Sequence, residues 1–117
     1  MGVNSSSYLT RSSAYLWPEG DGKISIWFDV TGTGTMDEIG ALTIILQKSS
    51  NETTWSTVKT FSYSDYPNMM EYDSVDCVSG VYYSGTEGMY YRAYVTVWAG
   101  KDGNGDSRQI LSATVQA

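Results

Sequence analysis

The alternation between Gly88 and Gly100 constrains the fold of this chain more than any other stretch. Every second residue is small and apolar or a buriable ring, in the order Tyr91, Ala93, Val95, Val97 and Ala99. The residues between them are aromatic, basic or hydroxylic, namely Tyr90, Arg92, Tyr94, Thr96 and Trp98. Side chains alternate between the two faces of a strand, so this period of two predicts a strand with unlike faces. We expect the first set in a core and the second set facing outward.

The rest of the sequence indicates an all-β chain. Tyrosine occurs 10 times and tryptophan 4 times in 117 residues, and such side chains favour pleated, half-buried surfaces. Residues 23–30 repeat the alternation, and turn residues recur about every 8–12 positions, which is typical of a sandwich of about seven strands. The prediction is an immunoglobulin-like antiparallel β-sandwich, with 1–7 as a flexible lead-in and 8–117 as a single domain.

Two adjoining segments are harder to assign. Residues 31–38, TGTGTMDE, are expected to form a glycine-rich loop. Residues 39–48 could begin a helix, because Thr35 and Glu38 have the spacing of a capping box. Gly40 and the β-branched run 43–45 oppose a helix, so a buried strand is predicted there.

Charge and hydropathy exclude several partners. Seven basic residues against thirteen acidic ones give a net charge of −6, and the basic residues are scattered. This charge distribution argues against nucleic acids and anionic membranes as binding partners. The sequence contains no apolar run of about 18 residues, so no membrane-spanning helix is predicted. The first residues lack an apolar leader segment, so either a leader is missing from this sequence or the protein stays in the cytoplasm.

The residue inventory argues against an enzyme. The chain has no histidine, which removes Ser-His-Asp and Cys-His arrangements. Cys77 is the single cysteine, so no internal disulfide forms, and its apolar neighbours predict a small buried side chain.

A possible calcium loop lies near the C-terminus. Asp102, Asn104 and Asp106 place oxygen atoms at alternate positions between glycines, as short loops that wrap Ca²⁺ do. Asp37 or Glu38 could complete the set of ligands from the same end of a sandwich. The alternative is a hairpin whose Asp, Asn and Gly residues only supply turn conformations. No other cofactor is indicated.

The candidate binding face is the outward set on the alternating strand, Tyr90, Arg92, Tyr94 and Trp98. Tyr, Trp and Arg dominate interface hot spots, and aromatic rings also stack on sugars. The expected neighbours on this face come from two strands: Thr43, Ile45 and Gln47 on one, and Arg108, Ile110, Ser112 and Thr114 on the other. The alternative is that these rings stabilise the sheet and bind nothing.

Two resemblances add to this interpretation. Residues 88–95, GMYYRAYV, resemble the penultimate strand of immunoglobulin-like and fibronectin type III-like domains, although Arg92 or Ala93 stands where antibody domains carry a cysteine. Segments 22–50, 54–70 and 87–107 together resemble a family of small uncharacterised secreted proteins of Gram-positive gut bacteria. That second resemblance implies an extracellular or cell-surface location and assigns no functional residue.

The sequence therefore predicts a non-enzymatic, secreted or cell-surface module that binds a protein or has a structural role. One alternative is a carbohydrate-binding module that uses exposed aromatic side chains. Another is a self-assembling component, because an unpaired strand edge or the aromatic face could pair with a second copy and form a homo-oligomer.

Overall fold

The computed structural model describes residues 7–117, so the expected lead-in, 1–7, lies almost entirely outside the described part. Seven strands and one turn of 3₁₀-helix account for the elements: β1 (Leu9–Gly20), β2 (Lys23–Ser49), β3 (Ser56–Ser62), η1 (Pro67–Met69), β4 (Met70–Ser84), β5 (Tyr90–Lys101), β6 (Asn104–Leu111) and β7 (Val115–Gln116). All strand pairs are antiparallel, which confirms the all-β prediction. Within 7–117, no helix is both long and apolar enough to cross a membrane.

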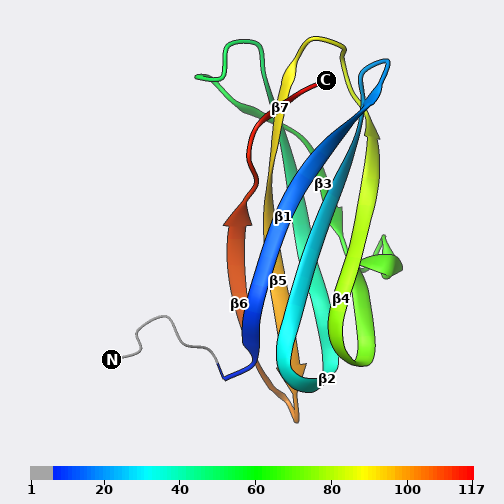
Figure 1. The fold of residues 1–117 in the computed structure, drawn as a ribbon, viewed down its shortest axis with the longest axis vertical. Coiled ribbons are helices and arrows are strands. Elements are labelled where there is room, and N and C mark those ends of the chain that lie inside the picture. Colours follow the sequence, from blue (N-terminus) through cyan, green and yellow to red (C-terminus); the bar gives the residue numbers. More distant parts are fainter. Residues whose placement is uncertain (1–6) are drawn as a thin grey trace.

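The seven strands form one curled sheet, and β2 holds it together. The first half of β2 pairs with β1 and β4, and its second half pairs with β5 and β3, while β4 follows β2 past the corner as far as Gly40. Figure 1 shows β2 descending, turning at the lower end of the molecule and rising again. The two halves of the sheet thereby face each other, and β1 contacts β5 and β6 although it pairs with β2 alone.

The predicted glycine-rich loop at 31–38 is instead the corner of β2, and the assignment of these residues to a loop was wrong. The pairing register between β2 and β4 shifts between Thr31 and Met36 at this corner. Gly32 is packed inside it, because an added Cβ would lie 3.0 Å from both the Gly34 carbonyl oxygen and the Met36 side chain. The glycines allow a sharp reversal without ending the strand. Residues 39–48 are extended, as predicted.

The interior follows the predicted alternation on β5. Each of Tyr91, Ala93, Val95, Val97 and Ala99 is 0% exposed. They belong to one hydrophobic core with the inward residues of the first half of β2, which are Ile24, Ile26, Phe28 and Val30. Burial of each large side chain contributes about 1.5–3 kcal/mol, so this two-sided packing is what keeps the sheet curled.

Cys77 lies in the same core, as its sequence neighbours predict, and is 1% exposed. Burial, helped by the carboxylates of Glu71 and Asp76, raises the pKa of the Cys77 thiol to about 12. A neutral buried thiol behaves as a small hydrophobic side chain.

Tyr91 is hydrogen-bonded to the loop that connects β4 and β5. Its hydroxyl oxygen accepts a 2.7 Å hydrogen bond from the backbone N–H of Thr86. Gly85 leaves room for this hydroxyl, because an added Cβ would lie 2.6 Å from the Tyr91 oxygen. The buried phenol therefore has a partner for its polar end and holds the loop against the start of β5.

Candidate functional site

The predicted outward set shares one face of β5, and each of its four side chains is partly exposed. The expected neighbours on β2 are confirmed: Gln47 pairs with Arg92, Ile45 with Tyr94 and Thr43 with Thr96. We call the set Tyr90, Arg92, Tyr94 and Trp98 the β5 face.

The expected neighbours on the last long strand were wrong by one residue. Arg108 and Ile110 pair with the inward residues Val97 and Val95, so they lie on the opposite side of the sheet. Ser107, Gln109 and Leu111 share the β5 face instead. Thr114 lies beyond the end of β6. Ser112 is buried and accepts a 2.9 Å hydrogen bond from the Ala93 backbone N–H.

At one end of the β5 face, the aromatic rings are covered by Arg92. Its guanidinium carbon lies 4.2 Å from the centre of the Trp55 ring and 5.6 Å from the centre of the Tyr94 ring. Its Nε donates a 2.9 Å hydrogen bond to Gln47. A stacked and hydrogen-bonded Arg of this kind stabilises the sheet and leaves less ring surface for a ligand.

At the other end, Trp98 lies over glycine. A Cβ at Gly105 would be 2.5 Å from two atoms of the Trp98 six-membered ring, and a Cβ at Gly100 would be 2.8 Å from the indole nitrogen. The ring therefore covers backbone that a larger residue would occupy. Its indole N–H donates a 3.3 Å hydrogen bond to Glu38 Oε1, which fixes its orientation.

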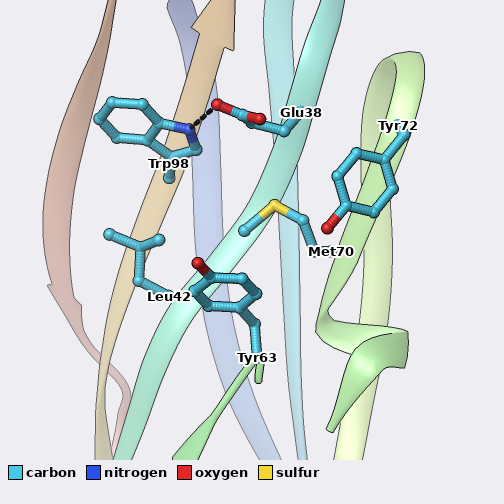
Figure 2. Close-up of a pocket in the computed structure, with 6 residues that line it drawn as sticks. All are labelled: Glu38, Leu42, Tyr63, Met70, Tyr72 and Trp98. Atoms are coloured by element: carbon cyan, nitrogen blue, oxygen red, sulfur yellow. Dashed lines mark hydrogen bonds between the residues drawn. The ribbon is translucent and has the colours of Figure 1, made fainter. Parts of the chain in front are cut away.

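A pocket of about 300 Å³ opens beside Trp98. Its lining comes from four parts of the chain and consists of Glu38, Leu42, Tyr63, Met70, Tyr72 and Trp98. Figure 2 shows the Trp98–Glu38 pair at one end, Leu42 and Tyr63 at the other, and Met70 and Tyr72 along the β4 side. We call this the Trp98 pocket.

The pocket depends on two irregularities of β2. A register shift between Ala41 and Thr43 lets the Leu42 side chain face outward beside the pocket. The start of β4 lies close against Gly40, because a Cβ there would collide with the Met69 carbonyl oxygen. Met70 pairs with Gly40 and Tyr72 with Glu38, so both reach the pocket from the edge of β2 opposite to β5. Tyr72 is 61% exposed. Sequence reasoning missed Leu42, Tyr63, Met70 and Tyr72, because no local pattern signals a bulge or the pairing of distant strands.

The pocket combines ring surfaces with hydrogen-bonding groups. Trp98, Tyr63 and Tyr72 supply aromatic surface, and the two phenols can donate and accept. Glu38 is the one carboxylate in the lining, and a carboxylate accepts about four hydrogen bonds. It therefore retains acceptor capacity after binding the Trp98 indole.

The predicted calcium loop has another structure. Asp102 and Gly103, at φ +54° and +80°, form a two-residue turn, and Asn104 and Asp106 already belong to β6. Asp37 lies beside the turn as expected, but its Oδ2 accepts a 2.8 Å hydrogen bond from the Asp102 backbone N–H. In residues 7–117, no three or more Asp, Glu, Cys or His side chains are grouped to hold a metal ion. The geometry is that of a type I′ hairpin turn.

No family model matches the chain, and no curated protein matches it. A solved structure that it is similar to is a family 76 glycoside hydrolase from a bovine Bacteroides thetaiotaomicron strain, with 14% identity and a TM-score of 0.38. The match covers 92% of this chain and 20% of that one. A likeness at this level carries no argument about fold or activity.

Proposed function

We propose that this chain is a non-enzymatic, secreted or cell-surface module that binds a saccharide in the Trp98 pocket. The observation that carries the proposal is the combination of the Trp98 ring with Tyr63, Tyr72 and Glu38 around one pocket. The C–H faces of a sugar ring pack on aromatic rings, and its hydroxyls donate to carboxylates and phenols.

The size and openness of the site suit one unit of a longer glycan. Its volume of about 300 Å³ lies at the small end of ligand pockets. Tyr63 and Tyr72 are both exposed. A saccharide chain could therefore enter from solvent without any rearrangement of the sheet.

We also propose an immunoglobulin-like sandwich as the class of this fold. Two observations support it: the halves of the curled sheet enclose one core, and Tyr91 hydrogen-bonds backwards to Thr86. A tyrosine near the start of a late strand that bonds to backbone a few residues upstream is a hallmark of immunoglobulin domains. The secreted location is supported by sequence resemblance alone.

A protein-binding role is the second candidate. The cluster of Trp55, Arg92 and Tyr94 favours it, because Arg, Trp and Tyr are the residue types enriched at interface hot spots. In the present arrangement their ring faces are already stacked on one another. The saccharide proposal therefore has the stronger support.

The saccharide proposal is tested by measuring retention on a glycan array. Tyr72→Ala removes an exposed ring from the pocket and should lower affinity about tenfold, while Glu38→Gln should weaken binding by a similar factor. Leu111→Ala, which trims an exposed apolar side chain of β6 away from the pocket, is the matched control and should bind as wild type. Retention of no glycan by wild type, or full retention by Tyr72→Ala, would contradict the proposal.

A further inference from the structure

A second group of aromatic side chains lies on the other half of the sheet. Tyr15 and Trp17 on β1, Trp27 on β2 and Tyr82 on β4 all face outward, and we call them the Trp27 platform. Cross-strand pairing aligns them: Tyr15 is opposite Trp27, and Ser25 lies between Trp17 and Tyr82. Trp17 is 57% exposed and Tyr82 is 69% exposed, so this platform is open to solvent.

The platform is built from ring contacts that leave ring surface uncovered. Tyr15 and Trp17 meet edge to face with centres 6.3 Å apart, and Trp27 and Tyr82 do the same at 6.3 Å. Trp27 covers Gly80, because an added Cβ there would lie 2.7 Å from its ring. Here, as at Trp98, a glycine on the neighbouring strand lets an indole rest on backbone. Both tryptophans of this kind therefore turn ring surface away from the sheet.

A chain of hydrogen bonds fixes the platform to a polar group. The Trp27 indole N–H donates to Ser25 Oγ at 3.0 Å, and Ser25 Oγ donates to Glu19 Oε2 at 2.6 Å. Ser25 is 0% exposed, so the central hydroxyl of this chain is shielded from water. Glu19 is thereby anchored beside the platform.

A pocket of about 500 Å³ adjoins the rings. It is lined by Glu19, Lys23, Tyr82, Tyr83 and Ser84. The lining contains one carboxylate and one ammonium group, so its net charge is close to zero. A neutral polyhydroxyl ligand can donate to Glu19 and accept from Lys23, whereas an anion or a cation would meet one like charge.

A second copy of this chain is not expected to bind to the Trp27 platform. Each copy carries a net charge of −6, and like-charged surfaces repel when they are brought together. A neutral saccharide meets no such repulsion and matches both the rings and the balanced pocket.

We propose that the Trp27 platform and its pocket form a second binding site for a neutral saccharide chain. It takes the ligand class of the proposed function but shares no residue with the Trp98 pocket. The platform residues lie on β1, the first half of β2 and β4, whereas Trp98 lies on the outward face of β5; Figure 1 shows where these strands lie in the curled sheet. One molecule therefore joins two glycan chains.

The test uses three neutral polysaccharides as probes: xyloglucan, a mixed-linkage β-glucan and a mannan. Affinity gel electrophoresis measures binding of each to wild type, Tyr82→Ala, Trp17→Ala, Tyr72→Ala and the double variant Tyr72→Ala/Tyr82→Ala. Turbidity of protein mixed with polysaccharide measures cross-linking. Val78→Ala, at an exposed position of β4 outside the platform, is the matched control, and circular dichroism checks that each variant is folded.

The expected result is that Tyr82→Ala and Trp17→Ala each weaken binding several-fold and abolish turbidity, while Val78→Ala matches wild type. The double variant should bind none of the probes. Unchanged binding and turbidity in both Tyr82→Ala and Trp17→Ala would overturn the second site, as would wild type that binds no probe. If Tyr72→Ala bound the probes as wild type does and Tyr82→Ala lost all binding, the proposed site in the Trp98 pocket would be contradicted. The proposed site on the Trp27 platform would be supported.

Discussion

The two outward sides of the sheet carry similar residue types that differ in their exposure and in their ring contacts. On the β5 face, Arg92 stacks on Trp55 and Tyr94, and no side chain of the set is highly exposed. On the Trp27 platform, Trp17 and Tyr82 are largely exposed, and their ring contacts are edge to face. The comparison teaches that aromatic side chains on a strand can be used by the protein itself, as around Arg92, or left for a ligand, and composition does not distinguish the two.

The largest expected difference is between two tryptophans. Trp98→Ala removes a ring that covers Gly100 and Gly105 and bonds to Glu38. We expect the free energy of unfolding to fall by roughly 2 kcal/mol, about half the loss for a fully buried tryptophan. Trp17→Ala, at a more exposed ring, should cost about 0.5 kcal/mol or less. Urea denaturation measures both, and equal losses would remove the distinction between the two faces.

A smaller effect is expected at Arg92. Replacing it by alanine removes its stacking on two rings and its bond to Gln47, so stability should fall by about 1–2 kcal/mol. Arg92→Lys should recover only part of this, because an ammonium lacks the planar fork. Arg11→Ala, at an exposed position of β1, is the control. If Arg92→Ala were as stable as Arg11→Ala, the β5 face would be as free for ligands as the Trp27 platform.

The smallest effect near neutral pH is expected at Cys77, in the core between the two faces. Its thiol has a pKa raised to about 12, so at about pH 8 almost none is ionised and a thiol reagent should react only as fast as the domain opens. In the unfolded chain the same thiol ionises near its ordinary pKa of 9.0. Ionisation therefore favours the unfolded chain increasingly as the pH rises from 9 towards 12, and stability falls. Rapid labelling of the Cys77 thiol in native buffer would contradict this prediction, because it would show that the core opens readily.

The residues of β5 that face the core and those that face outward could be predicted, because strict alternation of apolar and polar residues indicates a strand with one buried face. The position of β6 could not, since its register depends on turn length. The turn is two residues, Asp102 and Gly103. A shift of one residue exchanges the faces of a strand, which is why Arg108 and Ile110 face inward.

The Trp98 pocket and the Trp27 platform illustrate the same limit. Trp27 alternates with the apolar Ile26 and Phe28, so its outward direction was readable from the sequence. Its alignment with Tyr15 and Tyr82 was not, because that requires the pairing of β1 and β4 with β2. Likewise, Tyr72 and Trp98 line one pocket only because β4 and β5 pair with opposite edges of β2 near Gly40, which no short-range pattern encodes.

The shared strand β2 has a thermodynamic consequence. It pairs with β1, β3, β4 and β5, so neither half of the sheet can open while the other keeps all its hydrogen bonds. A ligand held by either side then stabilises the entire domain against unfolding, by an amount set by its concentration relative to its dissociation constant. Occupancy of one surface should slow amide exchange throughout the core, including beneath the surface that no ligand touches.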